Sequence, residues 1–113
     1  MPDIPDRFTK ESFLALDPDT AHAAVRAMAV REAMKIRFYD EKTVYVEKQS
    51  FHPDDWYLWA VVAQRLDGSY DVWTLNLTTG SMAYGHYCLN NTGVRQVLAM
   101  KKGVDAMPDG GPL

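Results

Sequence analysis

The chain has 113 residues, of which 47% are hydrophobic, so it is long enough to bury a core without help from metals or disulfides. Twelve lysines and arginines against fifteen aspartates and glutamates give a net charge of -3, and the two signs are interleaved along the chain. This balance excludes a protein that binds nucleic acid or a membrane surface through a basic patch, so we expect neither partner.

Three features bear on where the protein resides. Its longest apolar run, residues 58–63, is far shorter than the roughly 20 residues that a transmembrane helix needs. The start of the chain, Met1-Pro2-Asp3, lacks the apolar stretch of a signal peptide. The single cysteine, Cys88, cannot form an intramolecular disulfide, which fits a reducing compartment. We therefore predict a cytoplasmic protein.

The first third of the chain predicts two helices. Thr9 can cap a short helical turn that runs to Leu16. Asp17 can then accept hydrogen bonds from free N–H groups at the start of a second helix, where Pro18 needs no donor. From there to about Ile36 the chain is rich in alanine and contains no glycine, which predicts a long helix.

After this helix the apolar pattern changes from a period of 3.6 to a period of 2, which predicts strands at residues 43–47, 56–66, 70–77 and 81–88. The pair Asp67-Gly68 between the second and third strands is a strong hairpin signal. Residues 90–92 offer caps for a last helix over residues 93–102, which Gly103 ends.

This order of elements predicts an α+β fold. A long N-terminal helix would pack on a four-stranded antiparallel meander and a short C-terminal helix would follow, as in cystatin-like and α+β-roll architectures. We expect one domain over residues 1–103. Residues 104–113, with two prolines and two adjacent glycines, are expected to form a flexible tail.

The faces of the predicted sheet depend on the hairpin register. A two-residue loop at Asp67-Gly68 pairs Val62 with Trp73 and puts both on a face that we expect the long helix to cover. The other face is too apolar for ordinary solvent surface. It carries Tyr57, Trp59, Val61, Tyr70, Val72 and Tyr87.

Two readings of this aromatic face stay open. The C-terminal helix or the N-terminal segment covers it, or it is a recognition surface, since Trp and Tyr anchor many interfaces. The second reading gives our first functional hypothesis, a small non-enzymatic module of inhibitor, immunity or accessory type. It would bind a protein partner or a second copy of itself as a homodimer.

The alternative hypothesis is a small ligand-binding protein or enzyme with a pocket between helix and sheet. Its lining would be Gln64, Asp71, Trp73, Tyr84 and His86. A histidine held by a carboxylate can act as a general base, although a hydrogen-bonded histidine at the end of a core has the same pattern.

No short catalytic motif occurs, so we assign no catalytic residue and expect no cofactor. The cluster His52-Pro53-Asp54-Asp55 is the only local sequence that resembles a metal site. Its aspartates are more simply turn residues, so we predict no metal.

Overall fold

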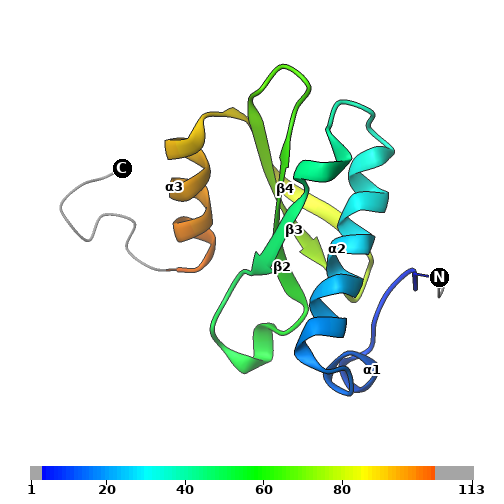
Figure 1. Cartoon of the computed structure of the whole chain (residues 1–113). Coiled ribbons are helices and arrows are strands. Elements are labelled where there is room, and N and C mark those ends of the chain that lie inside the picture. Colours follow the sequence, from blue (N-terminus) through cyan, green and yellow to red (C-terminus); the bar gives the residue numbers. More distant parts are fainter. Residues whose placement is uncertain (1–3, 104–113) are drawn as a thin grey trace.

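The computed structural model describes residues 4–103 in three layers, with α2 on one face of an antiparallel sheet and α3 on the other (Figure 1). This confirms the predicted α+β class and the predicted order of elements. The expected tail, residues 104–113, lies outside the described residues.

The helices begin where the sequence offers caps. Helix α1 spans Lys10–Leu14 behind Thr9, and α2 spans Pro18–Met34 behind Asp17, whose carboxylate accepts from the Thr20 N–H at 3.2 Å. Helix α3 spans Asn91–Lys101 behind Asn90. Within residues 4–103, no helix has both the length and the apolar composition that crossing a membrane requires.

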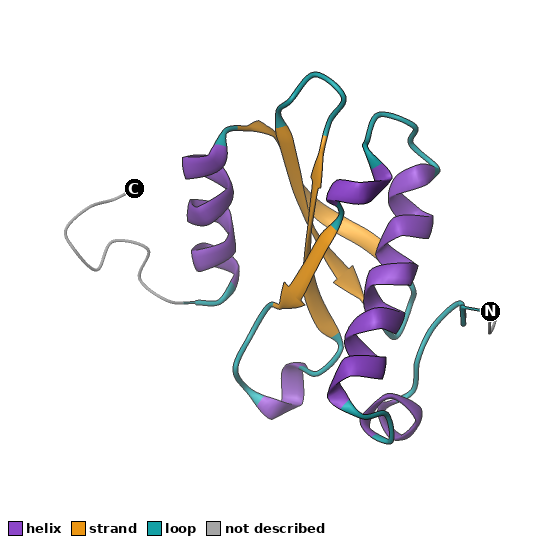
Figure 2. Ribbon diagram, viewed as in Figure 1, coloured by secondary structure: helices purple, strands orange, loops and turns teal. Residues whose placement is uncertain are grey.

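Four strands form the sheet in the order β1-β2-β3-β4, so β1 and β4 are its edges (Figure 2). They span Tyr45–Lys48, Leu58–Gln64, Tyr70–Asn76 and Ser81–Leu89. Short 3-10 turns precede β1 (η1, Glu41–Thr43) and β2 (η2, Pro53–Asp55).

The predicted register of the β2–β3 hairpin is wrong by one residue. The loop contains the three residues 66–68, because the Arg65 N–H donates to the Ser69 carbonyl at 2.7 Å and the Gly68 N–H donates to the Arg65 carbonyl at 2.9 Å. Gly68 has a φ of 96°, as the last residue of such a loop requires. Trp73 therefore pairs with Val61, and every side chain of β2 lies on the face opposite to the predicted one.

Both faces of the sheet are covered. On one face α2 packs over Trp59, Val61, Ala63, Trp73, Leu75 and Leu77, mainly through Val25, Met28, Ala29 and Ala33. On the other face α3 packs over Val62 and Val72 through Val97, with Val94 and Leu98 beside it. This explains why the central strands are apolar on both sides. Of the two readings left open for the aromatic face, the structure supports cover by helices and contradicts an exposed recognition surface, since α3 packs on Val72 and Trp59 is only 4% exposed.

Candidate functional site

Edge strand β4 contains two bulges. Thr74 pairs with Ala83, Val72 with His86 and Tyr70 with Leu89, so β4 uses three residues for every two of β3. The inserted positions are marked by Tyr84 and Cys88, at φ values of 54° and 59° in the left-handed region.

The bulges decide which way the aromatic side chains of β4 point. His86 pairs with Val72, whose side chain lies on the α3 face. Tyr87 lies on the α2 face, with its ring centroid 6.3 Å from that of Trp73. Gly85 leaves room for this arrangement, because a Cβ at that position would overlap the Tyr87 hydroxyl.

A buried carboxylate holds this part of β4 in place. Asp71 is completely buried and accepts hydrogen bonds from the Tyr39 hydroxyl at 2.5 Å, from Arg65 Nε at 2.9 and 3.0 Å, and from the Cys88 backbone N–H at 2.8 Å. We call Tyr39, Arg65, Asp71 and the Cys88 N–H the Asp71 clamp. The bond from the Cys88 N–H to Asp71 gives the backbone of the second bulge a hydrogen-bond partner, so the clamp stabilises the backbone that carries Tyr87.

The protonation equilibria of the clamp follow from its burial and its charges. Burial, with the Asp71 carboxylate as a second cause, raises the pKa of Tyr39 above its usual value. The hydrogen bond to Asp71 raises the pKa of Arg65. At neutral pH Tyr39 is therefore a neutral donor and Arg65 a cation, as the carboxylate requires.

In front of the clamp lies a groove of about 350 Å³ between the end of α2 and β4, which we call the α2–β4 groove. Its lining residues are Glu32, Lys35, Ile36, Trp73, Ser81, Met82, Ala83 and Tyr87. Ile36 is 40% exposed and Tyr87 is 54% exposed, while Trp73 is almost fully buried. At the rim, Lys35 Nζ lies 2.7 Å from Glu32 Oε2, so these two charges offset each other. The groove therefore combines an apolar floor and walls, formed by Trp73, Ile36 and Tyr87, with a polar rim, next to a sheet edge.

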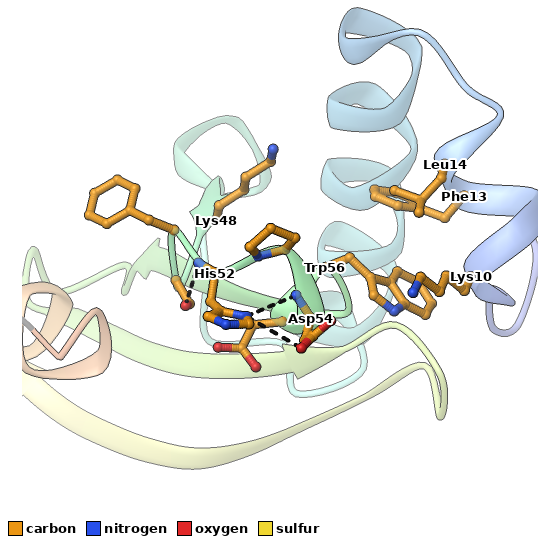
Figure 3. A pocket seen from close by; sticks show the side chains of 11 residues that line it. Lys10, Phe13, Leu14, Lys48, His52, Asp54 and Trp56 are labelled. Atoms are coloured by element: carbon orange, nitrogen blue, oxygen red, sulfur yellow. Dashed lines mark hydrogen bonds and ion pairs between the residues drawn. The ribbon is translucent and has the colours of Figure 1, made fainter.

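A second concavity of about 570 Å³, the α1 cleft, lies between α1 and the segment that joins β1 to β2. Figure 3 shows Phe13 and Leu14 of α1 on one side, His52 and Asp54 on the other, and Trp56 next to the α1 residues. Its lining is Lys10, Phe13, Leu14, Lys48, Ser50, Phe51, His52, Pro53, Asp54, Asp55 and Trp56.

The metal-like cluster of the sequence forms one wall of this cleft and serves as a turn. His52 Nδ1 accepts from the Asp54 N–H at 3.1 Å, so the imidazole caps η2. Residues 4–103 hold no group of three or more His, Cys, Asp or Glu side chains arranged to bind a metal ion.

The six residues predicted to share one binding face do not share a face. Tyr57, Trp59 and Val61 pack into the α2-side core, whereas Tyr70 and Val72 belong to the α3-side cluster. Of the six, Tyr87 alone lines the α2–β4 groove. The hairpin register accounts for the separation, because a shift of one residue exchanges the two faces of β2.

The polar members of the predicted pocket, Gln64, Asp71 and His86, do not come together either. Gln64 pairs with Tyr70 and His86 pairs with Val72 on the α3 side, while the Asp71 carboxylate is occupied by Tyr39 and Arg65. Two further members of that predicted pocket, Trp73 and Tyr84, are also apart. Trp73 forms the buried floor of the α2–β4 groove, and Tyr84 is 79% exposed at the first bulge.

Sequence reasoning missed Tyr39 and Arg65 as partners of Asp71. A signal for them existed, since an aspartate in an apolar strand needs donors once it is buried. The bulges left no comparable signal, because tyrosine and cysteine are not residues that favour the left-handed region.

Residues 27–93, more than half of the 113, match the family described as "Large polyvalent protein associated domain 24". No curated protein and no solved structure matches the chain. The matched region runs from the second half of α2 through β4, so it contains the whole α2–β4 groove and the Asp71 clamp. It leaves out α1 and most of α3.

Proposed function

The chain belongs to the large polyvalent protein associated domain 24 family, and from that premise we propose that it is a non-enzymatic protein-binding domain. It takes up an extended segment of a partner protein in the α2–β4 groove. The description of the family as a domain associated with large polyvalent proteins supports such an accessory role. The observation that carries the proposal is a groove with an apolar floor beside an edge strand, inside the region that matches the family.

The geometry favours an extended peptide over a helix as the bound segment. Within the described sheet β4 pairs with β3 on one side only, so its outer N–H and C=O groups can pair with a further strand. The bulge at Tyr84 limits regular pairing to the first part of β4, Ser81 to Ala83. One apolar side chain of the partner would then lie over Trp73, between Ile36 and Tyr87.

A short paired stretch has consequences for affinity and specificity. A contact of this size gives transient binding, since stable interfaces bury about 1,200–2,000 Å². Main-chain hydrogen bonds supply much of the affinity, and the site over Trp73 selects an apolar residue. A second copy of the chain is the other partner that the sequence suggested, and the experiment below distinguishes it. The cytoplasmic location stays a prediction.

The proposal is tested with a phage-displayed library of short random peptides selected on the purified protein. We expect enriched peptides with one recurrent large apolar residue. On binding, the amide resonances of Ser81 to Ala83 and of Ile36 should shift. Ile36→Arg should abolish binding, whereas Leu66→Arg should not, because Leu66 is also an exposed apolar residue but lies in the β2–β3 loop, outside the groove.

Gly85→Ala provides a variant that leaves the lining residues unchanged. It displaces the Tyr87 ring and should lower the affinity of the protein for the same peptides. Selection without enrichment, or shifts confined to other surfaces, would overturn the proposal. A concentration-dependent dimer in sedimentation that Ile36→Arg disrupts would also overturn it in favour of a homodimer.

A further inference from the structure

Lys101, in the last turn of α3, contacts the backbone of the first β4 bulge. Its ammonium donates to the Tyr84 carbonyl at 3.3 Å and to the Thr74 hydroxyl at 2.7 Å. The Thr74 hydroxyl in turn donates to the side-chain oxygen of Gln49 at 2.6 Å. Burial lowers the pKa of Lys101, because the described part of the chain places no carboxylate in an ion pair with its ammonium. A half-buried cation is therefore held beside the bulge at an energetic cost.

Tyr84 needs such a contact because its backbone adopts an unfavourable conformation. Its φ of 54° lies in the left-handed region, which residues other than glycine rarely adopt. The Tyr84 side chain is 79% exposed, so its packing contributes little to holding this conformation. The hydrogen bond from Lys101 to the Tyr84 carbonyl therefore supports the first bulge, as the bond from the Cys88 N–H to Asp71 supports the second.

The first bulge decides which residue of β4 lies opposite Trp73. Thr74 pairs with Ala83, so in a strand without the bulge Tyr84 would come next, opposite Trp73. The extra residue moves Tyr84 out of the ladder and brings Gly85 to that position. A tyrosine there would fill the space over the indole that we assign to the apolar side chain of the partner. A glycine leaves this space open.

From this geometry we infer that Lys101 is the positioning residue that keeps the α2–β4 groove open, acting from the opposite face of the sheet (Figure 1). By holding the first bulge it keeps Gly85 opposite Trp73, so that the groove selects a large apolar residue of the bound segment. The inference rests on the proposed function of the groove. Lys101 lies outside residues 27–93, so this support comes from beyond the region that matches the family.

The first measurement is made by NMR on the free protein. In the left-handed region the amide and α protons of one residue lie closer together than in a strand, so Tyr84 should give a strong intraresidue NOE. In Lys101→Met, which keeps the side-chain length but lacks the donor, this NOE should weaken and contacts between the Tyr84 and Trp73 rings should appear. Lys101→Arg should preserve the wild-type pattern. Lys102→Met is the matched control, because Lys102 pairs with Glu47 of β1 at 3.1 Å.

The second measurement is the affinity for the peptides selected on the wild-type protein. Lys101→Met should lower it about tenfold, which corresponds to the loss of one hydrogen bond to a charged group. Lys101→Arg and Lys102→Met should leave it unchanged. A selection repeated on Lys101→Met should lose the preference for a large apolar residue.

Tyr84→Gly separates the bulge from other roles of Lys101. Glycine adopts the left-handed region without steric cost, so this variant should hold the bulge without help and bind the peptides like the wild type. Adding Lys101→Met to Tyr84→Gly should then cause no further loss of affinity.

Three results would overturn the inference. An unchanged Tyr84 NOE in Lys101→Met would show that other contacts hold the bulge. A weakened NOE with unchanged peptide affinity would show that the bulge does not govern the groove. Equal losses of affinity with and without Tyr84→Gly would assign the effect to the packing of α3 on the sheet. If the wild-type protein binds no peptide, the proposed function fails instead, and the Tyr84 and Trp73 resonances of the free protein still decide whether Lys101 keeps the groove open.

Discussion

The Asp71 clamp makes the sharpest prediction about stability. Asp71→Ala removes the acceptor of three different donors, the Tyr39 hydroxyl, the Arg65 guanidinium and the Cys88 N–H. Asp71→Asn keeps the shape of the side chain but replaces one acceptor oxygen by an amide that itself donates. Both variants leave donors without a partner in a site where the carboxylate has no contact with water.

The expected loss of unfolding free energy follows from the cost of breaking a buried, hydrogen-bonded charge pair, which is about 3–5 kcal/mol. We expect the lower part of this range for Asp71→Ala, because the Arg65 side chain keeps 25% of its surface exposed and can regain water. For Asp71→Asn we expect about 1.5–3 kcal/mol, the cost of hydrogen bonds to a charged group. Either loss is a large fraction of the roughly 5–15 kcal/mol that stabilises a typical domain.

Urea unfolding followed by tryptophan fluorescence measures these losses, since Trp59 and Trp73 are both buried. Asp54→Asn is the matched control, because its carboxylate is 80% exposed, and it should change the unfolding free energy by less than about 0.5 kcal/mol. If Asp71→Asn unfolds at the same urea concentration as Asp54→Asn, the clamp does not stabilise the fold and the reasoning fails.

Three further variants test other parts of the structure. Burial and Asp71 raise the pKa of Tyr39, so the unfolded chain releases this proton near pH 10 and the folded chain retains it. The unfolding free energy should therefore fall as pH rises above about 10, and it should fall less steeply in Tyr39→Phe. If urea unfolding at several pH values gives the same dependence of the unfolding free energy on pH for both proteins, this reasoning is contradicted. Gly80→Ala should destabilise more than Gly68→Ala: both have positive φ, but a Cβ at Gly80 would overlap the Asp6 carbonyl oxygen, whereas Gly68 faces open space. Equal melting temperatures for the two variants would show that the N-terminal segment does not pack there. Asn90→Ala, which removes the acceptor of the Gly93 N–H, should cost about 1 kcal/mol and lower the helical circular dichroism signal of α3.

The boundaries of the helices and the existence of the strands could be predicted because their signals are local. Asp17-Pro18 marks a helix start through a single side chain, and α2 begins at Pro18. The last helix was predicted from residue 93 and begins at Asn91, because Asn90, the first of the three possible caps, is the one used. The Asp67-Gly68 pair likewise marked a hairpin that the structure contains. None of these signals depends on what packs against the element.

The hairpin register could not be predicted, because it depends on packing on both sides of the sheet. A strand with one wet face fixes its own register by alternation, but β2 is apolar on both faces. Leu66, 75% exposed, could close a two-residue loop as the last strand residue or open a three-residue loop, and both registers bury apolar side chains. In the observed register the buried Asp71 is satisfied by Arg65 of the same hairpin and by Tyr39, which comes from a segment far away in the sequence.

The clamp and the α2–β4 groove are physically linked, which bears on how the groove is built. Asp71 bonds the Cys88 N–H, Cys88 follows Tyr87, and Tyr39 packs edge-on against Trp73 at 5.1 Å. A residue that lines no part of the groove thus positions both its floor and one of its walls. The buried charge thus has a positioning role in this chain that an apolar core residue, even one that is at least as stabilising, would not fill. It follows that Asp71→Asn, at temperatures where the variant remains folded, should lower the affinity for peptides selected on the groove, although residue 71 makes no contact with them.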